Sequence, residues 1–95
     1  MSELILSPKA EQDLIDIWIY IAKDSPVNAD SYTDKLYDKG VILSENPELG
    51  TVRPDLMEEL RCFPIDNYVL YYRENSNGIE IVRFLHASRD IYAIF

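Results

Sequence analysis

The chain has 95 residues, of which 47% are hydrophobic, and its formal net charge at pH 7 is −8. This length predicts one small domain spanning residues 1–95, and this composition excludes a chain that is disordered throughout. The acidic balance argues against a protein that grips a nucleic-acid backbone over a wide face, so we expect no direct sequence-specific binding to nucleic acid.

The first half of the chain predicts a short strand, at residues 3–6, and then two helices. Ser7-Pro8 supplies an N-cap and a proline at the first helical position, and apolar residues follow at helical spacing to about residue 23. Ile15 and Ile19 widen the apolar stripe of this helix, so we expect the helix to be mostly covered. Ser25-Pro26 starts a second helix that ends near residue 44, and the short link predicts an antiparallel hairpin.

The second half predicts three strands that pair into one sheet. The order β-α-α-β-β-β therefore predicts a two-layer α+β domain, in which a helical hairpin packs on a small antiparallel sheet. Proline removes a backbone donor, so we expect Pro64 to end the first of these strands. Along the chain the expected segments are a loop at 51–56, strands at 60–63, 68–73 and 79–86, a turn at 75–78, and a last helical turn or apolar tail at 90–95.

The single cysteine and the first residues of the chain indicate the cellular compartment in which we expect the protein. Cys62 is the single cysteine, so no internal disulfide forms and a reducing environment fits. The first residues are too short and too acidic for a signal peptide, and no apolar run approaches the roughly 18 residues of a membrane span. We expect a cytoplasmic protein without membrane contact. One histidine, one cysteine and three glycines predict no metal site and no cofactor.

Three nitrogen-bearing side chains are the only candidates for acid–base or phosphate chemistry: Arg83, His86 and Arg89. Strand alternation places Arg83 and His86 on opposite faces unless the strand ends before His86. The alternative is structural, with His86 bonded to a backbone carbonyl and Arg83 paired with an acid such as Glu80 or Asp90.

Arginines and tyrosines also indicate a surface for a partner. All five arginines follow residue 50, and arginine and tyrosine are both common where proteins bind other macromolecules. We expect the partner-binding residues to be Arg61, Tyr71, Arg73, Arg83, His86, Arg89 and Tyr92.

Several short motifs occur in order along nearly the whole chain, and together they resemble the ParE toxins of the RelE/ParE superfamily. Each motif is weak alone, but the set is specific. The motifs include Asp13-Leu14-Ile15, Tyr20-Ile21-Ala22, Asp24-Ser25-Pro26, Asn46-Pro47, Arg53-Pro54-Asp55-Leu56, Leu60-Arg61, Tyr68-Val69-Leu70-Tyr71-Tyr72-Arg73, Ile79-Glu80-Ile81-Val82-Arg83-Phe84-Leu85-His86 and Arg89-Asp90.

The resemblance implies the toxin of a type II toxin–antitoxin module. It implies a ParD-like antitoxin that folds across the toxin in a hetero-oligomer, and DNA gyrase as a target that is inhibited by binding rather than by catalysis. The related RelE-like toxins cut mRNA on the ribosome with cations on the middle strands, where this chain has Leu60, Cys62 and Val69. This departure favours the non-enzymatic branch. A ribosome-dependent endonuclease using the Arg83–Arg89 group and an inactive toxin-like binding module are the alternatives.

Overall fold

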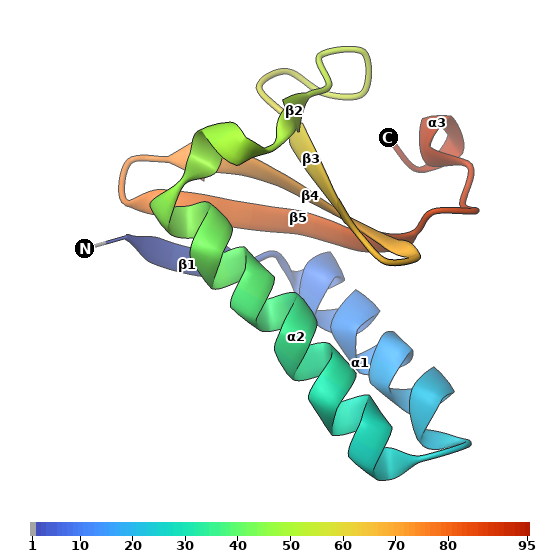
Figure 1. Ribbon diagram of the computed structural model, residues 1–95. Coiled ribbons are helices and arrows are strands. Elements are labelled where there is room, and N and C mark those ends of the chain that lie inside the picture. The colour runs from blue at the N-terminus through green and yellow to red at the C-terminus, as the bar shows by residue number, and fades with distance from the viewer. Residues whose placement is uncertain (1) are drawn as a thin grey trace.

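Two helices and a five-stranded sheet form two layers in the computed structural model, which describes residues 2–95 (Figure 1). The predicted α+β architecture, a helical hairpin on a small sheet, is confirmed. In chain order the elements are β1 (Glu3–Leu6), α1 (Pro8–Ala22), α2 (Pro26–Glu45), the 3₁₀ turn η1 (Pro47–Leu49), β2 (Thr51–Val52), β3 (Arg61–Ile65), β4 (Tyr68–Asn75), β5 (Gly78–His86) and α3 (Ile91–Ile94).

Both long helices begin where the serine–proline pairs predict. The Ser7 hydroxyl accepts a hydrogen bond from the Ala10 backbone N–H at 3.0 Å, and Ser25 caps α2 through Asn28 at 3.2 Å. These caps satisfy backbone donors that the first helical turn leaves without partners. The helices then run antiparallel and side by side on one side of the sheet (Figure 1). None of the helices described is both long and apolar enough to cross a membrane.

The strands lie in the order β1-β5-β4-β3-β2, and the sheet is mixed, so the expectation of an antiparallel sheet holds for β2 to β5 but not for β1. The last four strands pair antiparallel, whereas β1 joins β5 in parallel with Leu4 opposite Ile79 and Leu6 opposite Ile81. This pairing adds the two leucines to the core that the helices cover. The helical hairpin between β1 and the rest of the sheet supplies the long connection that a parallel pair requires.

Two further details differ from the sequence-based expectations. The strand β3 continues through Pro64, which lies opposite Val69 on β4, so the prediction that proline ends this strand is wrong. The neighbour β2 pairs only with Arg61 and Cys62, so the outer edge of β3 is open at Pro64 and needs no backbone donor there. The expected loop at 51–56 begins with the two residues of β2.

Each face of the sheet has its own apolar cluster. The helix-facing cluster includes Leu36 and Leu43 from α2, together with Tyr72 and Phe84 from the sheet. The opposite face holds a smaller cluster in which Leu60, Tyr71 and Leu85 are buried. The loop before β3 and the C-terminal helix α3 cover this second cluster, so the apolar end of the chain is a helical turn rather than a free tail.

Candidate functional site

Arg83 is held by an acid on α1. Its Nε and one Nη donate to the two Asp13 carboxylate oxygens at 2.7 and 2.8 Å, and both side chains are mostly buried. Asp13 also accepts the Phe84 backbone N–H at 3.1 Å. The hydrogen bonds that Arg83 donates to Asp13 raise the pKa of Arg83 above its ordinary value. The structural alternative therefore holds for Arg83, although its partner is Asp13 rather than Glu80 or Asp90.

A β-bulge in β5 precedes Arg83 and His86, so the strand alternates normally between them and the register keeps them on opposite faces, as expected. Tyr71 pairs with Arg83 but Tyr72 pairs with Ile81, so Val82 is an extra residue. Arg83 nevertheless contacts α1 through Asp13, and His86 contacts the helical layer at a separate place. Arg83 bonds Asp13 on α1, whereas His86 shares a cleft with Tyr20 and Tyr32 of the helical hairpin.

The seven predicted binding residues do not form one surface. Tyr71 is only 3% exposed, and burial raises the pKa of its phenol. Arg61 donates to the Gly50 carbonyl at 2.9 Å, and Arg73 pairs with Glu80 across the β4–β5 hairpin at 3.1 Å. The predicted residues that are exposed near the end of the chain are His86, Arg89 and Tyr92.

His86 and Arg89 line a cleft of about 740 Å³ where the end of the sheet meets the helical hairpin. The His86 ring lies edge-on to Tyr68 with 5.2 Å between ring centroids, and Tyr68 in turn contacts Tyr32. Burial and the nearby Asp66 carboxylate raise the pKa of Tyr32 to about 12.

The tautomer of His86 follows from its neighbours. The Ser88 backbone N–H donates to His86 Nδ1 at 3.1 Å, and the Ser88 hydroxyl lies 2.8 Å from the same atom. An N–H can only donate, so Nδ1 carries a lone pair and the ring proton is on Nε2. The imidazole therefore presents an N–H donor at Nε2 in a cleft that Arg89 also lines, which suits binding of an acceptor group better than removal of a proton.

The apolar cluster on the second face of the sheet contains no cation and no carboxylate, and its Tyr71 phenol is buried. Leu60, Cys62 and Val69 belong to this cluster, and Phe95 packs on Tyr71 with ring centroids 5.0 Å apart. At its border Arg53 forms a bidentate pair with Asp55, which also accepts the Tyr92 hydroxyl. In residues 2–95 no three His, Cys, Asp or Glu side chains gather as they would around a metal ion.

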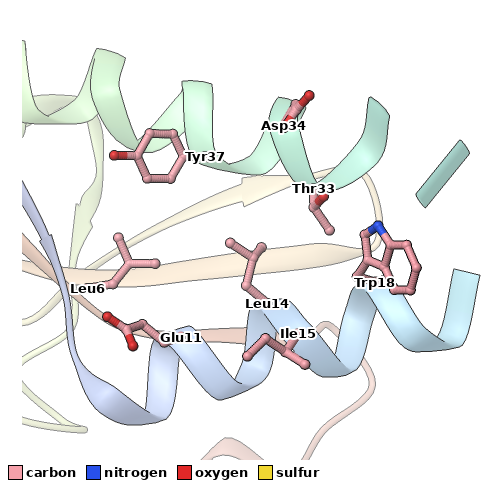
Figure 2. A pocket seen from close by; sticks show the side chains of 8 residues that line it. All are labelled: Leu6, Glu11, Leu14, Ile15, Trp18, Thr33, Asp34 and Tyr37. Atoms are coloured by element: carbon pink, nitrogen blue, oxygen red, sulfur yellow. The ribbon is translucent and has the colours of Figure 1, made fainter. Parts of the chain in front are cut away.

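Sequence reasoning missed an open apolar groove on the helical hairpin. Figure 2 shows the groove between α1 and α2, which has a volume of about 460 Å³. Ile15 and Ile19 are about half exposed, so the prediction that α1 is mostly covered is wrong. The apolar stripe of α1 is wider than the surface that α2 and the sheet can cover, and this excess width is the signal present in the sequence. The groove is lined by Leu6, Glu11, Leu14, Ile15, Trp18, Thr33, Asp34 and Tyr37.

The fold is that of a toxin from a type II toxin–antitoxin system. It matches a solved structure titled "Chromosomal ParDE TA system from P. aeruginosa" with a TM-score of 0.75, over 90% of this chain and 96% of that one, at 21% sequence identity. A curated relative named Toxin RelE2, from Caulobacter vibrioides (strain ATCC 19089 / CIP 103742 / CB 15), is 32% identical over 89 residues, which are 94% of this chain and 99% of the relative.

The family described as "ParE toxin of type II toxin-antitoxin system, parDE" matches residues 4–91. The chain therefore belongs to the ParE toxin family.

Proposed function

We propose that this protein is a toxin that inhibits DNA gyrase by binding, acts in the cytoplasm, and is neutralised by a ParD-like antitoxin. The observation that carries the proposal is the apolar lining of the second face of the sheet, the face opposite the helical hairpin. RelE-like nucleases place cations on the middle strands, whereas the corresponding Leu60, Cys62 and Val69 here lie in an apolar cluster under α3. None of these three side chains is a cation, so the positions cannot stabilise the phosphate charge that develops during RNA cleavage.

The exposed C-terminal end is the proposed contact with gyrase. Arg89 and Tyr92 are both exposed, and Arg89 forms no ion pair with any residue in the range 2–95. Arginine and tyrosine are also the side chains that contribute most at protein interfaces.

A supercoiling assay with purified gyrase tests this function. We expect the protein to inhibit supercoiling, the product of a neighbouring antitoxin gene to reverse the inhibition, and Arg89→Ala with Tyr92→Ala to weaken it by at least tenfold. Lys9→Ala with Tyr37→Ala is the matched control, because it also removes one exposed cation and one exposed tyrosine, here from the helices. Unchanged supercoiling at micromolar protein, or equal loss in the control, contradicts the proposal.

An endoribonuclease is the second candidate, and the cleft of His86, Arg89 and three tyrosines favours it. Histidine, arginine and aromatic rings can together hold a nucleotide and its phosphate. The test is cleavage of mRNA during translation after induction, compared with His86→Ala. Cleavage that disappears in this variant establishes the nuclease and removes the binding mechanism, whereas intact transcripts remove the nuclease.

A further inference from the structure

Four aromatic rings meet in the cleft where the end of the sheet reaches the helical hairpin. Tyr68 stands between two of the others, with its ring centroid 5.8 Å from that of Tyr32 and 5.2 Å from that of His86. Tyr20 adds the fourth ring from α1 and is 68% exposed, so this ring is open to a ligand. At about 740 Å³ the cleft has the volume of a small-molecule site. Its rings offer flat surfaces on which another aromatic ring can stack.

The turn that follows β5 brings two hydrogen-bond donors to the same cleft. The Arg89 backbone N–H donates to the His86 carbonyl at 3.0 Å, and the Ala87 N–H donates to the Asn67 carbonyl at 2.7 Å, which ties this turn to the β3–β4 turn. The Arg89 guanidinium forms no ion pair with any residue in the range 2–95, and the His86 ring carries its proton on Nε2. Both donors are therefore held by a fixed backbone and are available to an acceptor in the cleft.

The uncompensated charge that faces this cleft is positive, although the chain as a whole carries a net charge of −8. Arg89 and Asp66 are the charged residues of its lining, and Asp66 is paired with Lys35 at 2.8 Å. Lys23 adds a further cation, 6.0 Å from the centre of the Tyr20 ring. The aspartates that follow Lys23 and Arg89 in the chain do not line the cleft. The charged groups that face the cleft therefore favour an anion.

A second hollow extends the cleft along the hairpin. It has a volume of about 320 Å³, shares Ile21 and Tyr32 with the cleft, and reaches Asn28 and Lys35 of α2. Small-molecule sites commonly enclose about 300–1,000 Å³. The cleft and its extension thus have room for a ligand that combines an aromatic ring, a sugar-sized linker and an anionic end.

We propose that the cleft binds a free nucleoside monophosphate, with its base on the tyrosine rings and its phosphate on Arg89 and the His86 Nε2–H. Every nucleobase has a flat face that stacks on aromatic side chains, and the forked guanidinium matches the geometry of phosphate oxygens. This site goes beyond the proposed function and shares only Arg89 with the proposed gyrase contact. It also differs from the nuclease candidate, because the ligand is released unchanged.

Calorimetric titration of the full-length protein with adenosine 5′-monophosphate tests the site. We expect saturable binding at submillimolar concentration. Adenosine and ribose 5-phosphate should each bind about tenfold more weakly or worse, because each lacks one of the two recognised parts. An adenine oligonucleotide without terminal phosphates should also bind more weakly than the monophosphate. The proposal is overturned by an absence of saturable binding, by a smaller penalty for either fragment, or by tighter binding of the oligonucleotide.

Two variants and their controls separate the stacking surface from the charge. Tyr20→Ala should weaken the monophosphate about fivefold or more, whereas Tyr37→Ala, at an exposed tyrosine outside the cleft, should leave its affinity within about twofold. Arg89→Gln should abolish most of the preference for the monophosphate over adenosine. Lys9→Gln removes the same charge from an exposed position outside the cleft and should keep that preference. Equal effects of a variant and its control overturn the proposal.

The supercoiling assay separates this inference from the proposed function. A protein that inhibits gyrase but does not bind the monophosphate retains the proposed function and removes this inference. A protein that binds the monophosphate with the expected preferences but leaves supercoiling unchanged establishes the site and removes the proposed function.

Discussion

Asp13 and Arg83 are 70 residues apart in the chain and form a two-pronged ion pair between α1 and β5. Asp13 also accepts the Phe84 backbone N–H, so one carboxylate completes the edge of β5 beyond the point where β1 ends at Leu6. The Ser7 hydroxyl donates a hydrogen bond to the Val82 carbonyl of the same strand at 2.8 Å. Side chains of Ser7 and Asp13 therefore satisfy backbone groups of β5 that no neighbouring strand reaches.

Asp13→Ala should be strongly destabilising. The substitution leaves a mostly buried guanidinium and a backbone N–H without partners, so we expect a loss of about 2–4 kcal/mol in the free energy of unfolding. Urea unfolding measures this loss. Arg83→Met in the Asp13→Leu background removes both charges and should recover at least half of it. If the single variant unfolds within about 0.5 kcal/mol of the parent protein, the carboxylate is not the edge cap that the geometry indicates.

The Tyr72 hydroxyl links the sheet to the turn after α2. It donates to the Pro47 carbonyl at 2.7 Å and accepts the Gly50 N–H at 2.8 Å, on a fully buried side chain. Tyr72→Phe should cost about 1–3 kcal/mol, because the Gly50 donor is then buried without a partner. Gly50→Ala should also destabilise, since its methyl group would overlap the Tyr72 hydroxyl. Thermal unfolding tests both, with Tyr20→Phe, at a 68% exposed tyrosine, as the neutral control.

Acid stability should depend on Asp55. The hydrogen bond from Arg53 lowers the pKa of Asp55 from 3.8 to about 2. A carboxyl whose pKa is lower in the folded state adds stability above its unfolded pKa and loses that contribution as pH falls through the folded value. Melting temperature should therefore fall between about pH 4 and pH 2, and Asp55→Asn should make this fall shallower. Part of the fall in melting temperature should persist in this variant, because the hydrogen bond from Lys35 also lowers the pKa of Asp66. An unchanged pH profile in Asp55→Asn contradicts the pairing.

Local signals in the sequence predict much of this fold, and long-range pairings account for the rest. The serine–proline pairs at Ser7 and Ser25 fix the helix starts, because a cap and a proline act within one turn. The bulge at Val82 and the pairing of Arg83 with Asp13 have no such local signal, so the expected acid partner of Arg83 was wrong. The groove was missed for a related reason, since an apolar stripe does not say how much of it other elements cover.

The tautomer of His86 bears directly on the choice between binding and catalysis. With the Ser88 N–H donating to Nδ1, nitrogen NMR at a pH where the imidazole is uncharged should show the proton on Nε2. A ring fixed in this way presents a donor to the cleft and uses its lone pair internally, so it can hold an acceptor but cannot take a proton from a ribose hydroxyl at Nε2. The Ser88→Ala variant keeps the backbone donor and should preserve the tautomer, whereas Ser88→Pro removes that donor and should release it. A proton on Nδ1 in the parent protein contradicts the assignment, and it frees Nε2 as the base that a nuclease needs.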